Sequence, residues 1–292
     1  MSNARPPRRR RWHRHAGVFS LVIAAVVSLI AIFPLLWMAL SGLKSAAEVL
    51  AVPFRFWPSV LHPENYTSLL TGQVDASFFP AGASYVWALA FTFIVSAISV
   101  ALSLIVNSMA GYVFARLKFP GKRILWIVFL IPWFVPAMTT YISTFQVVND
   151  LNMLDTVGVL ILPGVVYSYS IFFFRQFFLN VPTSVEEAAK IDGASFFRTY
   201  TGIFLPMSGT PLTIMGISVF LGYWSSFLWP SMTVSNPRLY QINQLISYLK
   251  STYSQHMHLV LAASAMAAIP TIVLLLIFQR QIMQGVKISG MK

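Results

Sequence analysis

The chain has 292 residues, of which 57% are hydrophobic and only 10% are charged, and its formal net charge is +12. A soluble domain carries about 25% charged residues, so this composition excludes an ordinary soluble protein and indicates a membrane protein with several spans. The absence of cysteine excludes disulfides, thiolate chemistry and cysteine-based metal sites. The basic residues stand at the ends of apolar stretches and not along one polar face, which argues against nucleic-acid binding.

Six stretches of the chain contain no Asp, Glu, Lys or Arg, namely 15–43, 76–115, 124–149, 156–174, 199–237 and 251–279. Crossing a hydrocarbon core of roughly 30 Å takes about 20 mostly apolar residues, so each stretch can hold one span. Open backbone hydrogen bonds are costly in lipid, so every span is expected to be helical. We therefore predict an all-α fold with six transmembrane helices near 17–41, 85–113, 124–144, 157–178, 210–230 and 258–280.

The first part of the chain divides into three segments. Residues 1–16 are a basic tail rich in Arg and Pro, and the first transmembrane helix is expected at 17–43. Its apolar run is longer than the roughly 7–15 residues of a signal-peptide core, so we expect it to stay uncleaved. Residues 44–82 are expected to be an extracytoplasmic segment, whose aromatic residues favour either a position along the membrane surface or contact with an extracellular partner.

The rest of the chain is expected to form a five-helix core at 83–282 and a short tail at 283–292. With the N-terminus in the cytoplasm, the outer segments hold only Lys44, Arg55, Arg238 and Lys250, and the inner segments hold the other sixteen basic residues. Cytoplasmic loops of membrane proteins carry an excess of Lys and Arg. This bias predicts that both termini are cytoplasmic and that the polar segment 182–208 is cytoplasmic as well.

The sequence contains no residue spacing that is typical of a catalytic triad or a metal site, so we expect no enzyme activity and no metal. Gly121-Lys122 resembles the end of a phosphate loop, but that loop needs a glycine five residues earlier, where Arg116 stands. We therefore expect no cofactor on this chain. A secondary transporter is a weaker alternative, because the spans lack central charged residues and no broken, paired helices are visible in the sequence.

The polar segment 182–208 has the pattern of a short helix followed by a turn and a second, amphipathic half. Thr183-Ser184-Val185-Glu186 fits a capping box with Thr183 as the N-cap. Ala188 and Ala189 favour a helix with a smooth surface, and Gly193 is expected to end or bend it. Apolar residues at helical spacing then predict packing against the inner ends of the spans; these are Phe196, Phe197, Tyr200, Ile203 and Phe204. An ordinary interfacial helix or a docking element would fit this pattern.

Glu187-Ala188-Ala189, then Gly193, then Ile203, Leu205 and Pro206 resemble the EAA loop of ABC-importer permeases. Ile191-Asp192-Gly193-Ala194 is similar to the carbohydrate-uptake branch of that family, which includes the maltose-transporter permeases. Shorter matches at 111–122, 223–230, 268–270 and 279–285 extend the resemblance over roughly residues 83–292. Two features depart from the family pattern: Ser225 replaces the usual Asn, and the chain ends Gly290-Met291-Lys292.

The resemblance implies a type I ABC-importer permease fold in the bacterial inner membrane. It implies a transport subunit for oligosaccharides that forms a heterodimer with a second, homologous permease. It also implies two ATPase subunits, which bind ATP and Mg, and an extracytoplasmic solute-binding protein. An importer for another solute, such as an acidic sugar or glycerol phosphate, is the alternative within the family.

The resemblance also implies which residues couple the permease to its ATPases: Glu186, Glu187, Ala188, Ala189, Asp192, Gly193, Ile203, Leu205 and Pro206. Glu186 and Glu187 are expected to pair with basic residues of the ATPase, and Gly193 is expected to form the bend. The expected substrate path contains Tyr223, Trp224, Ser225 and Ser226, because aromatic rings stack on sugars and hydroxyl groups bond to them. Packing between helices is the alternative role for these four residues.

Overall fold

The computed structural model describes residues 12–74, 78–252 and 254–290, and every regular element in them is a helix. Most of the predicted basic tail and the last two residues of the predicted C-terminal tail lie outside the described residues. The chain forms two compact units: unit 1 consists of residues 1–71 and 253–266, and unit 2 consists of residues 72–252 and 267–292.

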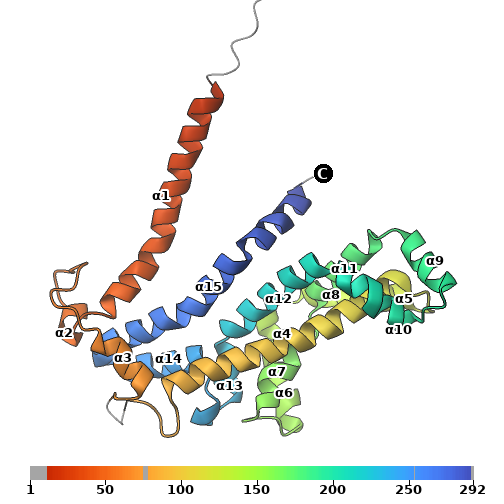
Figure 1. The fold of residues 1–292 in the computed structure, drawn as a ribbon. Helices are drawn as coiled ribbons and strands as arrows, with labels where there is room; N and C mark the ends of the chain where they lie inside the picture. The colour runs from red at the N-terminus through yellow and green to blue at the C-terminus, as the bar shows by residue number, and fades with distance from the viewer. Residues whose placement is uncertain (1–11, 75–77, 253, 291–292) are drawn as a thin grey trace, which may run out of the picture. The chain divides into compact units, whose positions relative to one another are not determined.

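The α-helices, shown in Figure 1, are α1 Trp12–Ser41, α2 Ala46–Val49, α3 Glu64–Thr71, α4 Tyr85–Arg116, α5 Lys122–Leu130, α6 Ala137–Asp150, α7 Val157–Ile161, α8 Ser168–Leu179, α9 Thr183–Ile191, α10 Phe196–Thr199, α11 Leu205–Met207, α12 Gly209–Trp224, α13 Leu228–Thr233, α14 Ile242–Thr252 and α15 Met257–Gly290. Four 3-10 turns lie at Ile131–Phe134, Leu162–Gly164, Pro237–Leu239 and Ser254–His256. A π-helical turn at Tyr200–Phe204 joins α10 to α11.

Three helical segments are each long and apolar enough to cross a membrane: Phe19–Ser41, Tyr85–Arg116 and Met257–Gln281. The other three predicted spans are broken into bent pairs of helices, with bends of 112° between α5 and α6, 44° between α7 and α8, and 80° between the segment Phe196–Met207 and α12. Counting each pair as one span gives up to six spans, as the sequence predicts.

The breaks correct one expectation, because the sequence did not reveal broken helices. Pro136 lies in the first break, Pro163 and Gly164 precede the second, and Pro206 precedes the third. Proline removes a backbone donor and crowds the preceding turn, which ends or bends a helix. The predicted span at 210–230 is also interrupted, since α12 ends at Trp224.

The centre of unit 2 is α4, against which α8 and α12 pack along its length (Figure 1). Gly111 permits the close approach of α4 to α8, because a Cβ atom there would lie 2.6 Å from Cβ of Phe174 and 3.1 Å from the carbonyl oxygen of Ile171. One face of α4 carries fully buried polar residues at intervals of three or four: Thr92, Ser96, Ser99, Ser103 and Asn107. Small polar residues are typical of closely packed membrane helices.

In unit 1, hydrogen bonds connect the segment after α1 to α3. Asn65 donates from Nδ2 to the carbonyl oxygens of Gly42 and Lys44, both at 2.9 Å, and the Tyr66 hydroxyl donates to Ala39 at 2.7 Å. Within the predicted extracytoplasmic segment, the described residues thus form the helices α2 and α3, and α3 is bonded to the end of α1 and the turn that follows it. Hydrogen bonds from Ser59 lower the pKa of the Glu48 carboxyl within this segment.

Candidate functional site

The predicted coupling segment begins with α9, whose start differs from the prediction. Thr183 is the first helical residue, Pro182 occupies the N-cap position, and no side chain caps this end. The predicted capping box is therefore wrong. Glu186 instead forms an ion pair with Lys190 at 2.7 Å, one turn further along the same helix.

Gly193 ends α9 with a left-handed backbone conformation, at φ 72°. The Ala194 N–H donates to the carbonyl of Ala189 at 2.9 Å, and the Gly193 N–H donates to that of Lys190 at 3.0 Å. This pair of bonds is the Schellman arrangement, in which glycine at the left-handed position satisfies the last carbonyls of a helix. The structure thus gives a physical reason for glycine at the predicted bend.

Arg116, the last residue of α4, binds the segment that leads into α9. Its guanidinium donates to the carbonyl oxygen of Phe178 at 2.6 Å and to that of Val181. The same group lies 3.9 Å from a carboxylate oxygen of Glu186 and 5.1 Å from the ring centroid of Phe204. The Arg116 side chain is only 7% exposed, so it supports the predicted coupling segment from inside the protein.

Tyr112, one turn before Arg116, forms the base on which the second half of the segment rests. Its ring stacks against Phe196 with centroids 4.7 Å apart and against Tyr200 at 5.3 Å, and it contacts Phe204 at 4.7 Å. The Tyr200 hydroxyl lies 2.7 Å from the hydroxyl of Ser108 on α4. The predicted packing of this half against a span is confirmed, except that Phe197 is 63% exposed.

The outer face of α9 consists of residues at helical spacing that are all exposed: Ser184, Glu187, Ala188 and Ile191. The side chain of Ile191 is 86% exposed, which is unusual for an isoleucine. Ile191 is not among the predicted contacts, although a lone isoleucine at the end of a polar helix is a visible signal in the sequence.

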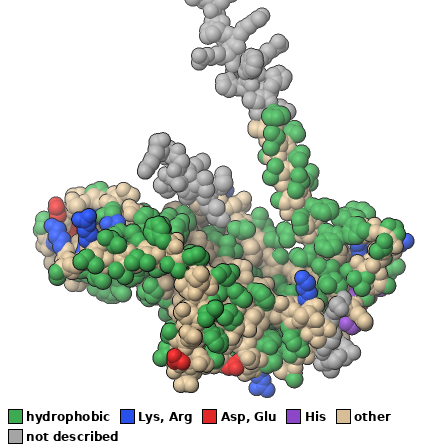
Figure 2. Space-filling view, turned by 180° about the vertical axis from the view of Figure 1, so that it is seen from behind, with side chains coloured by type: hydrophobic (Ala, Val, Ile, Leu, Met, Phe, Trp, Pro, Cys, Tyr) green, Lys and Arg blue, Asp and Glu red, His purple; other side chains and the backbone are tan. Residues whose placement is uncertain are grey.

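The structure separates the nine predicted coupling residues into three groups. Glu187, Ala188 and Asp192 are exposed on the surface. The inward-facing residues are the half-buried or buried Glu186, Ala189, Ile203 and Leu205. Gly193 and Pro206 lie where the backbone turns or bends. Basic side chains gather at this end of unit 2, as Figure 2 shows; the exposed ones are Lys118, Arg123, Lys190 and Arg198.

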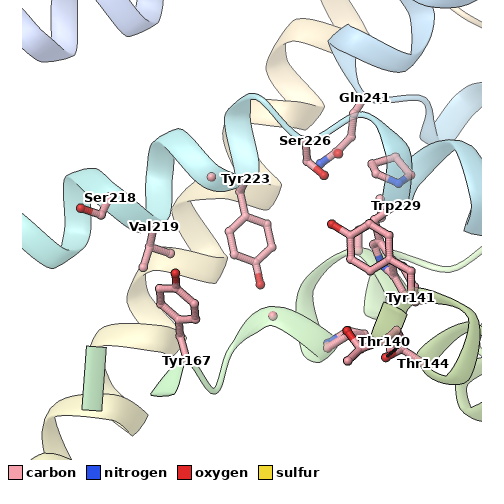
Figure 3. Close-up of a pocket in the computed structure, with 15 residues that line it drawn as sticks. Thr140, Tyr141, Thr144, Tyr167, Ser218, Val219, Tyr223, Ser226, Trp229 and Gln241 are labelled. Atoms are coloured by element: carbon pink, nitrogen blue, oxygen red, sulfur yellow. Dashed lines mark hydrogen bonds between the residues drawn. The ribbon is translucent and has the colours of Figure 1, made fainter. Parts of the chain in front are cut away.

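A cavity of about 420 Å³ lies between α6, α7, α12, α13 and the start of α14. Figure 3 shows side chains from these separate elements facing one space. Its polar and aromatic lining residues are Thr140, Tyr141, Thr144, Tyr167, Ser218, Tyr223, Ser226, Trp229 and Gln241. Such a mixture of aromatic faces and a few polar groups is typical of small-molecule sites.

Two of the four residues predicted for the substrate path line this cavity, Tyr223 and Ser226. Trp224 is only 4% exposed, stacks on Phe220, and donates from Nε1 to the carbonyl of Ala267 at 3.1 Å, so it packs between helices. The Ser225 hydroxyl donates to the carbonyl of Leu221 within its own helix. The structure thus places Trp224 and Ser225 outside the cavity lining.

The break between α7 and α8 forms one wall of the cavity, and side chains from other elements satisfy its backbone. Tyr223 donates from its hydroxyl to the carbonyl of Ile161 at 2.8 Å, and Trp229 donates from Nε1 to that of Val159 at 2.9 Å. Asn107 donates to the carbonyl of Val165 at 3.0 Å and accepts from the Tyr167 N–H at 3.1 Å. Non-helical backbone at membrane depth is tolerated only with such partners.

Two lining residues that were not predicted, Tyr141 and Gln241, differ in how visible they are in the sequence. Tyr141 follows two threonines inside a charge-free stretch, which was a detectable cluster of polar residues. Gln241 stands in a loop of mixed composition, and only the fold brings it to the cavity.

Among the described residues, no group of three or more His, Cys, Asp or Glu side chains could hold a metal ion.

Comparisons with known proteins agree on one family. Residues 103–287 match the family model described as "Binding-protein-dependent transport system inner membrane component". The chain is 30% identical to the arabinooligosaccharides transport system permease protein AraQ of Halalkalibacterium halodurans, over 92% of this chain and 94% of that protein. It is 29% identical to the diacetylchitobiose uptake system permease protein NgcG of Streptomyces coelicolor, over 92% and 87%.

A third relative is the sn-glycerol-3-phosphate transport system permease protein UgpE of Rhizobium meliloti, 28% identical over 92% of this chain and 94% of that protein. Among solved structures, a chain of a bacterial ABC transporter involved in the import of the acidic polysaccharide alginate superposes with a TM-score of 0.77. That match covers 94% of this chain and 99% of the other at 20% identity. The likeness confirms the predicted fold class.

Proposed function

Because the chain belongs to the family of binding-protein-dependent transport system inner membrane components, we propose that it is the permease subunit of an ATP-driven importer of oligosaccharides. Members of this family are multi-pass permeases of the inner membrane, transport components that work with an ATPase and a solute-binding protein. Family membership disfavours a secondary transporter, even though the spans are broken. In the proposed assembly, a second homologous permease completes the translocation path, and two ATPase subunits bind ATP and Mg.

The observation that carries this proposal is the construction of the coupling segment. One face of α9 is exposed and carries Glu187, Ala188 and Ile191. On the other face, Glu186 lies 3.9 Å from Arg116, and Val185 packs against the buried cluster that contains Tyr112. An element that transmits force needs a free contact surface and a rigid base. The exposed face docks on the ATPase, and the base passes its displacement to α4.

From α4 the displacement reaches the helices that pack against it, α8 and α12. Closure of the ATPases on binding ATP moves the coupling segment, and the bent spans change their packing between inward-open and outward-open states. A ligand shifts such an equilibrium only by its different affinity for the two states. ATP binds the two states of the partner ATPase subunits with different affinity. This chain connects the ATPase subunits mechanically to the spans.

The oligosaccharide assignment is supported by two relatives, an arabinooligosaccharide permease and a diacetylchitobiose permease. It is also supported by the cavity, which offers the aromatic faces of Tyr141, Tyr223 and Trp229 to a ligand. Glycerol phosphate remains the alternative cargo, since another relative carries that name.

A substitution on the exposed face of α9 tests the coupling function. Ala188→Arg adds a long charged side chain to the proposed contact without entering the folded core, because Ala188 is exposed. We expect the variant to be inserted normally but to lose co-purification with the ATPase and to lose oligosaccharide uptake. Lys118→Ala, at an exposed position on the neighbouring inner turn, is the control and should retain both activities. Normal ATPase binding and uptake by Ala188→Arg would contradict the proposal.

A further inference from the structure

We propose that the cavity of unit 2 is a subsite for an uncharged sugar unit and that Gln241 determines its specificity by donating a hydrogen bond to the sugar. This inference rests on the proposed transport of oligosaccharides and narrows it to neutral ones. It assigns to this subunit a direct contact with the cargo, at a residue that the sequence motifs do not include.

Gln241 is a buried amide at the edge of the cavity (Figure 3). The residue is only 1% exposed, and its Nε2 atom has no hydrogen-bond partner among the described residues. A buried donor without an acceptor is unfavourable, whereas a donor that binds a ligand oxygen is satisfied. The Gln241 amide is therefore suited to recognise an oxygen atom inside the cavity.

The backbone around Gln241 fixes the position of this amide. Its carbonyl accepts the Leu245 N–H at 2.9 Å and so begins α14. The next residue, Ile242, donates its N–H to the Thr92 hydroxyl of α4 at 2.8 Å. Residues held on rigid elements define a binding geometry more closely than residues on loose loops.

Four of the other polar groups that line the cavity donate their hydrogen atoms to backbone carbonyls. The Tyr223 hydroxyl donates to Ile161, Trp229 Nε1 donates to Val159, and the Ser218 hydroxyl donates to Ile214 at 3.0 Å. Thr144 likewise donates to the carbonyl of Thr140 at 2.8 Å. The hydroxyl oxygens of Tyr223, Ser218 and Thr144 can still accept hydrogen bonds, since a hydroxyl oxygen has two lone pairs. The wall therefore offers a sugar hydroxyl several acceptor oxygens, and none of the described lining residues is charged.

The lack of charge among the fifteen described lining residues distinguishes a neutral sugar from an anion. A sugar hydroxyl both donates and accepts, so it can donate to the wall and accept from Gln241. A phosphate or carboxylate only accepts when ionised, and away from water it needs several donors or a cation. None of the fifteen described lining residues is charged. The cavity of this subunit therefore favours uncharged sugars over phosphate esters and uronates.

The aromatic side chains supply the remaining part of the subsite. The rings of Tyr141 and Trp229 lie 5.9 Å apart at an angle of 54°, and Tyr223 and Tyr167 line the same space. A volume of about 420 Å³ falls within the range of small-molecule sites, about 300–1,000 Å³. Aromatic faces provide apolar surface for the C–H groups of a sugar ring, while Gln241 and the acceptor oxygens bind its hydroxyl groups.

The experiment uses the complete importer in lipid nanodiscs, with its partner permease and ATPases. Binding of arabinotriose, diacetylchitobiose, an oligouronate and glycerol 3-phosphate is measured without the solute-binding protein, by the intrinsic fluorescence to which Trp229 contributes. Uptake of the same four compounds is measured in proteoliposomes with the solute-binding protein present. We expect wild type to bind at least one neutral sugar and neither anion.

Two variants change this donor: Gln241→Leu removes it, and the isosteric Gln241→Glu replaces the amide nitrogen with a carboxyl oxygen. Both should weaken neutral-sugar binding at least tenfold without changing ATPase co-purification. The matched control is Gln244→Leu, one turn further along α14, where the amide donates to the carbonyl of Val234 at 2.8 Å and is not part of the cavity lining. It should lower thermal stability and leave the sugar affinity unchanged.

The outcomes separate this inference from the proposed function. If wild type takes up no oligosaccharide at all, the proposed function and this inference both fail. If wild type takes up a neutral oligosaccharide but Gln241→Leu and Gln241→Glu bind it normally, only this inference fails. Tighter binding of glycerol 3-phosphate or the oligouronate than of the neutral sugars would overturn the neutral specificity.

Discussion

Asn107 accepts the backbone N–H of Tyr167 at 3.1 Å while its amide nitrogen donates to the carbonyl of Val165 at 3.0 Å. One buried side chain of α4 therefore holds both sides of the break between α7 and α8. Tyr112 and Arg116, which support the proposed coupling segment, belong to the same helix. α4 thus connects the cavity wall to the proposed ATPase contact within one rigid element.

Asn107→Leu is expected to impair transport, because Tyr167 loses the hydrogen bond that fixes its position. The substitution leaves two buried backbone groups without partners, at roughly 1–3 kcal/mol each. We expect a lower unfolding temperature of the nanodisc complex and at least a tenfold loss of uptake. Ser103→Ala is the control, because it removes only the 2.7 Å bond from Asn107 to the Ser103 hydroxyl and keeps both backbone bonds. Equal effects of the two substitutions would show that Asn107 does not hold the break.

Gly164→Ala is expected to displace Tyr223 from the cavity wall. An added methyl group would collide with the Tyr223 hydroxyl and lie 3.0 Å from its Cζ atom. The bond from Tyr223 to Ile161 would then be lost, and we expect reduced uptake with unchanged ATPase co-purification. The double variant Gly164→Ala/Tyr223→Phe removes the colliding oxygen and should recover part of the thermal stability.

The control for Gly164→Ala is Gly158→Ala in the same broken span. A Cβ atom at Gly158 would meet its nearest neighbour at 3.6 Å, an ordinary contact. We expect this variant to behave like wild type in uptake. If Gly158→Ala and Gly164→Ala are equally defective, the collision with Tyr223 does not explain the loss.

The sequence predicted the apolar helical segments and the turn at Gly193, because apolar length and the backbone freedom of glycine act locally along the chain. It did not predict the breaks, since Pro136 and Pro163 stand inside apolar stretches that also suit continuous helices. The pairing of Arg116 with Glu186 and the position of Gln241 depend on contacts between residues distant in sequence. Such contacts leave no periodic pattern in the sequence from which they could be predicted.

Gly193→Pro is expected to abolish coupling. Proline fixes φ near −65°, whereas Gly193 has φ 72°, and proline also lacks the N–H that donates to Lys190. Gly193→Ala should cost roughly 1–2 kcal/mol through backbone strain alone, because no described atom lies within 4 Å of the added methyl. Gly193→Asn is the control, since asparagine tolerates this conformation. Full ATPase binding and full uptake by Gly193→Pro would disprove the role of α9.

Substitutions of Arg116 and Glu186 distinguish a residue that supports the segment internally from a residue that contacts the ATPase. Arg116→Ala removes the donor to Phe178 and Val181 from a side chain that is only 7% exposed. Hydrogen bonds from a charged group are worth about 1.5–3 kcal/mol each, so we expect a loss of roughly 3 kcal/mol in stability and a failure to couple.

Glu186→Gln should have a much smaller effect than Arg116→Ala. Its carboxylate lies 3.9 Å from Arg116 and is partly exposed, so loss of its charge is expected to cost less than about 1 kcal/mol. ATPase co-purification and the unfolding temperature of the complex measure both effects. If Glu186→Gln instead abolishes ATPase binding while the unfolding temperature stays at the wild-type value, Glu186 pairs with the ATPase, as the sequence predicted. Glu187→Gln on the exposed face then serves as the comparison for a direct contact.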